Sequence, residues 1–479
     1  MKKKLLFAGS EVMPFAATGG LGDVLGSLPE ALAGADKELD VRVVMPLYST
    51  ISHEWREKMT FEKSFYVRLA WRVQYCGIFS LVKNRVTYYF IDNEYYFRHQ
   101  GLYGFYDDGE RYAYFSAAIV AMMPQLGWYP DIFHANDWQT APAVIYLNRA
   151  RASLEYCNMR TVFTIHNIAF QGEYDLAILG DVFDLRPEEA HLVELNGCIN
   201  LMKGAIVTAD AVTTVSPTYA REIMTEEYGK GLQAILQENA YKVRGILNGI
   251  DYVYYNPWTD AVLPKKYSAG RPSGKNACRT AMRAEVGLPD TGVPLMALIS
   301  RLTAQKGLDI VEAAIRGILR DTQAQLIVLG KGDAEYENFF RNLEQEFPDQ
   351  VRALLIYDRE LSKRVYAAAD IFLMPSKTEP CGLSQMIASR YGAIPVVRET
   401  GGLADSIHCY YEKDGEMFGN GFTFYDYRAD TLYYAVHGAV GLWNDKEKRK
   451  KIVQTVMTAD FTWHTSAKEY LKLYTDILK

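Results

Sequence analysis

Short apolar runs alternate with amphipathic segments along most of the 479-residue chain. Runs of three to five residues rich in β-branched and large apolar side chains are typical of buried strands. Strands that are separated by helices pair in parallel, because each crossover returns the chain to the same edge of the sheet. The alternation therefore predicts an α/β fold built from doubly wound parallel sheets. The predicted strands lie at residues 5–8, 41–44, 131–133, 161–165, 211–215, 295–299, 325–329, 371–374 and 394–397.

A six-residue turn occurs twice in the chain. Residues 18–23 read Thr-Gly-Gly-Leu-Gly-Asp and residues 400–405 read Thr-Gly-Gly-Leu-Ala-Asp, so five of six positions are identical. Each copy follows a predicted strand and opens a potential helix, an arrangement that offers backbone N–H groups to a phosphate. Either copy alone also fits a tight turn without a ligand. The pair predicts two similar α/β domains that face a shared crevice.

The domain boundary is predicted near residues 245–275, where turn residues lead into a stretch rich in Pro, Lys, Gly and Ser. We expect an N-terminal domain over residues 1–250 and a C-terminal domain over residues 251–455. The remaining segment, 456–479, is expected to pack back on the first domain.

Two further local features are predicted. A helix over residues 466–478 has apolar residues at helical spacing behind a Thr465/Ser466 cap. Two tyrosine-rich runs, at about 64–75 and 78–91, predict a hairpin inserted in the first domain.

Composition excludes several classes of protein. The net charge of −6 argues against a general affinity for nucleic acid or acidic membranes. No stretch approaches the roughly 18 apolar residues of a membrane span, and we interpret the apolar run after Met1 as a first strand. The six scattered cysteines form no Cys-x-x-Cys pair, which favours reduced thiols in a cytoplasmic protein.

Two polar clusters follow predicted strands of the first half. His134-Ala-Asn-Asp-Trp138 contains Asp137, which fits either a helix cap or a ligand-binding carboxylate. His166 and Asn167 follow the next strand, at the edge where ligands bind in open α/β sheets. A single histidine in this position is also compatible with a purely structural role.

Two more clusters follow strands of the second half. Arg301 and Lys306 lie in one turn and suit a phosphate pair, Arg as a fork and Lys as a point charge. Glu379 precedes Cys381, and a carboxylate followed by backbone amides suits the hydroxyl groups of a sugar. No signal of a Cys-His enzyme accompanies Cys381. Since the chain has no Asp-x-Asp triplet, we expect diphosphate chemistry without a metal.

Taken in order, these motifs resemble the bacterial glycogen synthases and plant starch synthases, which are retaining glycosyltransferases of the GT-B type. The resemblance covers nearly the whole chain. It rests on the motifs at residues 18–24, 134–138, 164–167, 214–217, 247–251, 300–307, 329–333, 375–383, 390–392, 400–405 and 460–463.

The resemblance implies two Rossmann-like domains that face an interdomain cleft. It also implies an enzyme that transfers glucose from ADP-glucose to the non-reducing end of glycogen or another α-1,4-glucan, with no cofactor or metal. It assigns a catalytic role to His166, Arg301, Lys306 and Glu379. It assigns donor binding to Thr18, Gly19, Gly20, Tyr357, Cys381, Gly382 and Leu383, and the acceptor side or floor of the cleft to Asp23, Tyr96, Asp137 and Asn167.

Two positions depart from the family pattern. Ala17 stands where the family usually has a lysine before the first glycine turn, and Asn136 stands where many members have histidine. A charged hydrogen bond contributes about 1.5–3 kcal/mol, so the missing ammonium is expected to weaken donor binding roughly ten- to a hundredfold. The alternatives are a glucan-binding protein with decayed catalysis and a related glycosyltransferase that uses UDP-glucose. A dehydrogenase is disfavoured, because neither glycine turn has Gly-x-Gly-x-x-Gly spacing.

Overall fold

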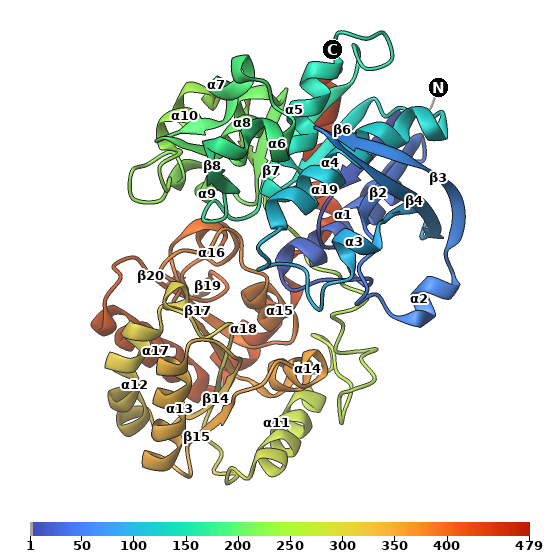
Figure 1. Ribbon diagram of the computed structural model, residues 1–479. Helices are drawn as coiled ribbons and strands as arrows, with labels where there is room; N and C mark the ends of the chain where they lie inside the picture. The colour runs from blue at the N-terminus through green and yellow to red at the C-terminus, as the bar shows by residue number, and fades with distance from the viewer. Residues whose placement is uncertain (1–2) are drawn as a thin grey trace. The chain divides into compact units, whose positions relative to one another are not determined.

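The structure is a computed structural model that describes residues 3–479. The chain divides into two compact units. Unit 1 contains the chain up to Gly249 together with Trp463–Lys479, and unit 2 contains Ile250–Thr462 (Figure 1).

Unit 1 is built on a sheet that has nine strands within residues 3–479, in the order β12-β11-β7-β6-β1-β2-β5-β4-β3. The strands from β12 to β5 run parallel, whereas β4 pairs antiparallel with both β5 and β3. Their bounds are β1 (Lys3–Ala8), β2 (Leu39–Pro46), β3 (Thr60–Leu69), β4 (Arg72–Lys83), β5 (Val86–Asp92), β6 (Ile132–Asn136), β7 (Arg160–Ile165), β11 (Ala211–Thr214) and β12 (Val243–Gly245). A small antiparallel sheet comprises β8 (Glu173–Asp175), β9 (Glu194–Leu195) and β10 (Cys198–Asn200).

The predicted hairpin is present, but its bounds are wrong. Residues 76 and 77, which separate the two tyrosine-rich runs, lie in the middle of β4, and the turns fall at 70–71 and 84–85. Ala70, Asn84 and Arg85 have positive φ there, so the turns are made by residues that the tyrosine pattern does not mark.

The helices of unit 1 cover both faces of the sheet. Consecutive residues of β1 from Leu5 to Ala8 are at most 1% exposed, as expected for a strand buried on both faces. The helices are α1 (Gly20–Ala35), α2 (His53–Glu57), α3 (Glu94–Phe97), α4 (Asp108–Leu126), α5 (Ala141–Ala150), α6 (Leu179–Phe183), α7 (Ala190–Val193), α8 (Leu201–Thr208), α9 (Pro217–Glu222), α10 (Gln233–Glu238) and α19 (Trp463–Ile477).

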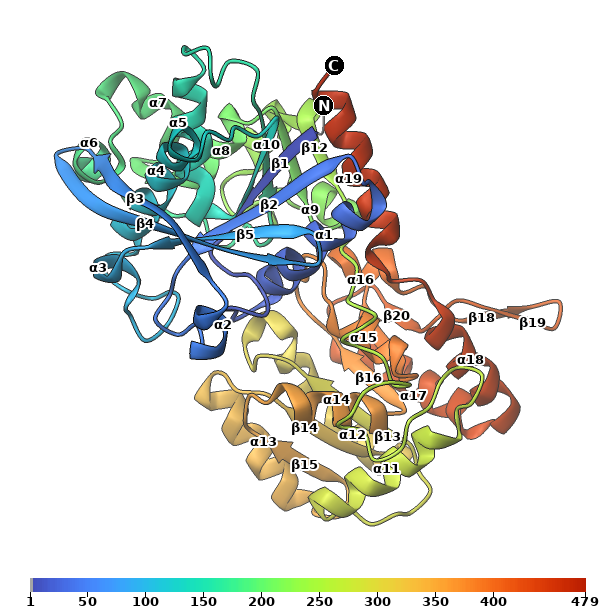
Figure 2. The same cartoon turned by 90° about the vertical axis from the view of Figure 1, so that its right-hand side faces the viewer.

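The C-terminal helix α19 packs against unit 1 beside α1 (Figure 2). Its buried residues include Tyr470 and Tyr474, and the Tyr474 hydroxyl is 2.7 Å from His134 Nδ1 on β6. The helix begins at Trp463, three residues earlier than predicted. The predicted cap residue Ser466 instead donates its hydroxyl hydrogen to the Leu247 carbonyl.

Unit 2 contains a parallel sheet that has six strands in the described part of the chain, in the order β15-β14-β13-β16-β17-β20. A two-stranded ribbon, β18–β19, extends from this unit (Figure 2). The strand bounds are β13 (Leu295–Ile299), β14 (Gln325–Leu329), β15 (Val351–Leu354), β16 (Ile371–Met374), β17 (Ile394–Arg398), β18 (Tyr411–Lys413), β19 (Glu416–Phe418) and β20 (Phe422–Phe424).

The helices of unit 2 also lie on both faces of their sheet. On one face α12 and α17 lie side by side, and both contribute to the core that contains Met296 and Leu298 of β13 (Figure 1). The intervening residue Ala297 is fully buried as well, so the opposite face is also covered. The helices are α11 (Ser273–Val286), α12 (Leu308–Thr322), α13 (Ala334–Glu346), α14 (Arg359–Ala368), α15 (Ser384–Arg390), α16 (Gly401–Ser406), α17 (Ala429–Asn444) and α18 (Lys446–Thr458).

Candidate functional site

Each sheet has one point at which the strand order reverses. In unit 1 the chain builds outward from β1 in both directions, with β2 on one side and β6 on the other; in unit 2, β13 has β14 and β16 as its neighbours. Ligands of open α/β sheets bind beyond the carboxyl ends of the strands at such points. Most of the predicted site residues follow β1, β6 and β7 in unit 1, or β13, β15 and β16 in unit 2. Each set is described within its own unit.

An ion pair lies at the reversal point of unit 2. Lys306 Nζ is 2.6 Å from Glu379 Oε2, and Ser376 Oγ donates to the same oxygen at 2.9 Å. The two charged side chains are only 15% and 9% exposed. No hydrogen bond to Glu379 Oε1 is found within residues 3–479, so this oxygen remains to accept from a ligand hydroxyl.

Two hydrogen bonds to backbone carbonyls hold the two loops of this ion pair together. The Lys377 N–H donates to the Gln305 carbonyl at 2.9 Å, and Gln305 Nε2 donates to the Thr378 carbonyl at 3.2 Å. Because β13 and β16 are parallel neighbours, the loops leave the sheet at the same edge. Lys306 and Glu379 are therefore brought together by strand pairing, although 73 positions separate them.

Arg301 and Tyr357 extend the same edge of unit 2 into solvent. Arg301 is exposed, and its guanidinium group has no hydrogen bond or ion pair with any residue from 3 to 479. Tyr357 follows β15, is 69% exposed, and its hydroxyl accepts a hydrogen bond from Arg359 Nε at 2.9 Å. The edge thus presents a free cation and an accessible aromatic ring.

The loop after Glu379 presents two backbone donors. Gly382 and Leu383 are partly exposed, and their N–H groups have no acceptor in the described part of the chain. Cys381 is buried at 5% exposure. The loop can therefore donate two hydrogen bonds to a ligand that also reaches Glu379.

The second glycine turn supports this loop instead of offering its own amides. The Gly402 N–H donates to the Glu379 and Pro380 carbonyls at 3.2 and 3.1 Å. A Cβ atom on Gly401 would lie 1.9 Å from the Glu379 carbonyl oxygen, and one on Gly402 would lie 2.3 Å from that of Cys381. The interpretation of this turn as a phosphate cradle is wrong for the Gly402 amide. The glycines permit close backbone packing.

The first glycine turn already holds an anion of the protein. Glu11 Oε2 accepts from the N–H groups of Thr18 and Gly19 at 2.6 and 3.0 Å, and Glu11 Oε1 accepts from the Thr18 hydroxyl at 2.8 Å. In this structure the carboxylate takes the place that the sequence interpretation gave to a diphosphate on Gly19. The Gly20 N–H has no acceptor among residues 3–479. Sequence reasoning missed Glu11, although an acidic residue in the apolar first segment was a signal.

Asp137 does not cap a helix, so that predicted role is wrong. Its side chain makes no cap hydrogen bond, and Oδ1 instead accepts from the His166 N–H at 2.7 Å. Burial raises the pKa of Asp137 to about 7, although hydrogen bonds from the His166 and Asn167 amides lower it; the charge of Glu11 adds to the rise. The carboxyl group therefore links the ends of β6 and β7.

The His166 ring is held by Asn136. Its Nε2 is 2.9 Å from Asn136 Oδ1, while Asn136 Nδ2 donates to the Ala8 carbonyl at 3.1 Å. Because Oδ1 only accepts, His166 Nε2 carries the hydrogen and Nδ1 is free of it. Burial lowers the pKa of His166 to about 3, so the ring is neutral. The unusual Asn136 thus has a definite role in orienting His166.

Comparison with known proteins identifies the family. The family profile described as "Starch synthase catalytic domain" matches residues 4–238, and the one described as "Glycosyl transferases group 1" matches residues 280–456. A glycogen synthase of Ligilactobacillus salivarius is 46% identical over 99% of this chain and 100% of its own length. A glycogen synthase of Bacillus subtilis is 44% identical over 99% of this chain and 98% of its own. The chain belongs to the glycogen and starch synthase family.

A solved structure of the family is similar over its whole length. The catalytic domain of starch synthase IV from Arabidopsis thaliana, bound to ADP and acarbose, has a TM-score of 0.89 and 36% identity, and 99% of each chain is covered. The predictions of a GT-B fold with two Rossmann-like domains and of a glucosyltransferase of this family are confirmed.

Not every residue that the family resemblance assigned lies at these edges. Tyr96 is fully buried in α3, stacks on Tyr114 with ring centroids 4.6 Å apart, and donates its hydroxyl hydrogen to Glu110 at 2.7 Å. It offers no surface to a ligand in this structure. Asn167 Oδ1 accepts from the Ala169 N–H at 3.0 Å, and Asp23 lies in the first turn of α1.

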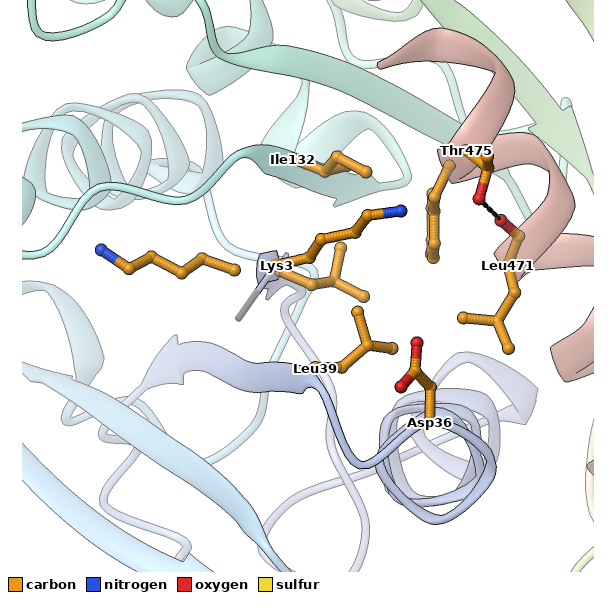
Figure 3. A pocket seen from close by; sticks show the side chains of 9 residues that line it. Lys3, Asp36, Leu39, Ile132, Leu471 and Thr475 are labelled. Carbon is orange, nitrogen blue, oxygen red and sulfur yellow. Dashed lines mark hydrogen bonds between the residues drawn. The ribbon is translucent and has the colours of Figure 1, made fainter. Parts of the chain in front are cut away.

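A small cavity of about 60 Å³ lies at the opposite edge of the unit 1 sheet (Figure 3). Its lining residues include Lys3, Leu39 and Ile132, the first residues of β1, β2 and β6, together with Leu471 and Thr475 of α19. Since the predicted site residues follow the carboxyl ends of these strands, the cavity is separate from the candidate site.

Residues 3–479 contain neither a metal-binding group of side chains nor a membrane-spanning helix. Within residues 3–479, no three His, Cys, Asp or Glu side chains are grouped so that they could hold a metal ion. Over the same residues, no helix has both the length and the apolar character needed to cross a bilayer.

Proposed function

We propose that this member of the family transfers glucose from ADP-glucose to the non-reducing end of an α-1,4-glucan such as glycogen, with retention of configuration. The observation that carries the proposal is the Lys306–Glu379–Ser376 cluster at the reversal point of the unit 2 sheet. The cluster is intact, which argues against a binding protein that has lost catalysis. The family relationship and the ADP-bound starch synthase IV give further support.

Unit 2 is proposed to bind the donor. Arg301 binds the diphosphate with its free guanidinium group, while Lys306 contributes its charge as ADP departs. Glu379 Oε1 accepts from a glucose hydroxyl, and the Gly382 and Leu383 amides, with the Cys381 backbone, donate to the sugar oxygens. The exposed Tyr357 ring stacks on the adenine.

Unit 1 is proposed to act on the acceptor side of the same reaction. The Gly20 amide donates to the donor phosphates, while Thr18 and Gly19 hold Glu11 and so fix the turn. His166 is assigned a place beside the reacting glucose. Asp137 and Asn167 are assigned to the acceptor side of the site. Asp23 is assigned to the acceptor side, and Tyr96, which is buried in α3, has no proposed contact with a ligand.

The leaving phosphate is proposed to take the proton of the acceptor hydroxyl. The neutral His166 ring then serves for positioning, because a histidine with a pKa of about 3 is a weak base at neutral pH. Arg301 and Lys306 stabilise the negative charge that develops on the diphosphate.

We place the reaction in the cytoplasm. The six cysteines form no disulfide bond in the structure, and Cys157, Cys198 and Cys409 are exposed. Exposed unpaired thiols fit a reducing compartment.

The test is a donor screen on the purified protein with a glycogen primer. ADP-glucose should release ADP and lengthen the glucan chains, and an α-1,4-specific glucosidase should remove the added glucose. We expect UDP-glucose to be at least about tenfold poorer, which corresponds to roughly 1.4 kcal/mol. Equal product without primer would refute the acceptor assignment. A preference for UDP-glucose would refute the donor assignment.

A further inference from the structure

We propose that Gln385 is a positioning residue, which turns the Gly382 and Leu383 amides toward the transferred glucose. The proposal rests on the donor role assigned above to these two amides. Gln385 lies in α15, one residue beyond the helix start, and is fully buried.

The side-chain amide of Gln385 contacts both carbonyl groups of the donor loop. Its Nε2 is 2.9 Å from the Gly382 carbonyl oxygen and 3.2 Å from that of Cys381. A third contact, of 3.0 Å, joins Nε2 to Ser406 Oγ, which itself donates to the Gly402 carbonyl at 2.6 Å. Gln385 thus connects the donor loop to the helix that follows the second glycine turn.

The planarity of the peptide bond converts these carbonyl contacts into control of the amides. In a trans peptide the C=O of one residue and the N–H of the next lie in one plane and point in opposite directions. The Cys381 carbonyl shares a peptide group with the Gly382 N–H, and the Gly382 carbonyl shares one with the Leu383 N–H. When Gln385 draws both carbonyls inward, both N–H groups face the other way, where they have no acceptor within residues 3–479.

A purely space-filling role explains Gln385 poorly. Its Oε1 is buried without a hydrogen-bond partner in the described chain, which is an unfavourable state for a polar atom. An apolar side chain of the same length would fill the space without that cost. The side chain therefore tolerates an unpaired oxygen while its Nε2 holds the two carbonyls.

The decisive variant is Gln385→Met, which removes the Nε2 donor and keeps the length of the side chain. We expect the Kd for ADP-glucose to rise about tenfold or more, since two hydrogen bonds to glucose are weakened. The Kd for ADP should stay within about twofold, because ADP lacks the glucose that these amides bind. The ratio of the two Kd values, measured by calorimetry, is the readout, and kcat should fall as well.

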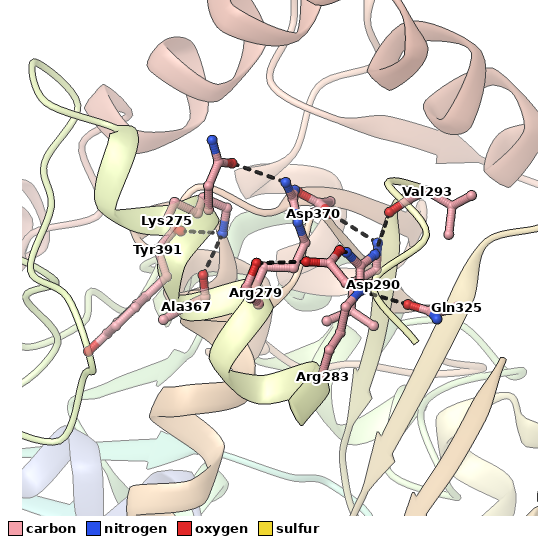
Figure 4. Close-up of polar contacts among 12 residues, drawn as sticks. Lys275, Arg279, Arg283, Asp290, Val293, Gln325, Ala367, Asp370 and Tyr391 are labelled. Carbon is pink, nitrogen blue, oxygen red and sulfur yellow. Dashed lines mark hydrogen bonds and ion pairs between the residues drawn. The ribbon is translucent and has the colours of Figure 1, made fainter. Parts of the chain in front are cut away.

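Gln325→Met is the matched control. Gln325 is 1% exposed, and its Nε2 likewise donates to two carbonyls, of Pro289 at 2.8 Å and Asp349 at 3.1 Å. It lies beside Arg283 at the start of β14, at the amino edge of the same sheet (Figure 4). Its loss should lower the melting temperature and leave the ratio of the two Kd values unchanged.

The outcomes separate the two proposals. If the unaltered protein released no ADP from ADP-glucose with glycogen, the proposed function would fail, whatever the variants did. The positioning role is refuted if the unaltered protein is active and Gln385→Met raises the Kd for ADP and the Kd for ADP-glucose equally. It is also refuted if neither Kd changes. Should Gln385→Met not fold, Ser406→Ala removes the third Nε2 contact and should shift the same ratio about threefold; an unchanged ratio there overturns the proposal.

Discussion

Glu379 Oε2 accepts hydrogen bonds from both the Lys306 ammonium and the Ser376 hydroxyl, and these two bonds fix the carboxylate in one orientation. The two charges are largely removed from solvent, so each depends on the other, and loss of one leaves a buried charge without its partner. At this scale the chemistry of the site depends on very few atoms.

Glu379→Gln tests that dependence. The variant keeps the shape of the side chain and removes its charge, so Lys306 loses its counter-ion and the glucose loses an ionic acceptor. We expect kcat to fall by about a hundredfold or more, and the melting temperature to fall as well, because the Lys306 ammonium is left buried without its counter-ion. The measurement is ADP release at saturating donor.

The control for this variant is Glu346→Gln. Glu346 pairs with Arg316 on the surface of unit 2, where the carboxylate is 36% exposed. Turnover should be unaffected there. A near-normal rate for Glu379→Gln would remove Glu379 from the active site.

Ala17→Lys tests the missing cation. A Cβ atom on Gly22 would lie 2.3 Å from Ala17 Cβ and 3.4 Å from Glu11 Oε2, so position 17 is near the Glu11 carboxylate. A lysine that contacts the donor phosphates should bind ADP-glucose about tenfold more tightly. Ala17→Met, which adds length without charge, should leave the affinity for ADP-glucose unchanged. Unchanged affinity for Ala17→Lys would indicate that Glu11 takes up the new ammonium.

At the scale of elements, the two copies of the glycine turn show that one local sequence serves two purposes. Both copies begin a helix, α1 at Gly20 and α16 at Gly401, as predicted. The first copy binds the carboxylate of Glu11, whereas the second packs backbone to backbone against the loop of Glu379. Sequence patterns therefore predicted the turn and the helix start, and the surrounding strands decided what each turn contacts.

Gly402→Ala tests the backbone contact. The new Cβ atom would lie 2.3 Å from the Cys381 carbonyl oxygen, and the three nearest atoms all belong to the Cys381 backbone, which has less room to move than a flexible side chain. We expect the melting temperature to fall and the KM for ADP-glucose to rise several-fold, because the loop that binds glucose must shift. Gly441→Ala in α17 is the control, since a Cβ atom there meets nothing within 4 Å. It should stabilise the helix by up to about 1 kcal/mol. Equal effects of the two substitutions would contradict this account.

At the scale of the whole molecule, both ends of the chain belong to unit 1. Strand β1 lies at its centre, and α19 packs beside α1 after the chain has completed unit 2. The helical spacing near the C-terminus predicted the helix itself. The contact between Tyr474 and His134 joins residues 340 positions apart, a separation at which no local pattern operates.

The stability of unit 2 depends in part on a buried lysine. Lys275 on α11 donates to the Tyr391 and Ala367 carbonyls at 2.8 and 3.1 Å, and thereby joins three helical segments (Figure 4). Burial lowers the pKa of Lys275 to about 8, with the Asp370 carboxylate opposing the shift. The folded state therefore releases this proton at lower pH than the unfolded chain does.

Lys275→Met tests this pH dependence. Below pH 8 the lysine is charged in both states and its burial is unfavourable, so the free energy of unfolding should rise by about 1.4 kcal/mol per pH unit from pH 8 toward 10.5. Denaturant titrations at pH 8.0 and 9.5 should show the rise in the parent and a flatter profile in Lys275→Met. The exposed Lys446→Met should keep the profile of the parent. Identical profiles for the parent and Lys275→Met would contradict the prediction.

The sequence by itself determined most of the parallel strands and the family. Apolar runs located those strands, glycine turns marked helix starts, and the ordered motifs identified the glycogen and starch synthases. Those signals are local, because they arise from side chains that are close along the chain. Only the tertiary structure decided that Glu11 fills the first turn, that Asp137 holds the His166 amide and that Gln385 holds the donor loop. These contacts follow from the order and register of the strands, which place residues from distant segments at a common edge.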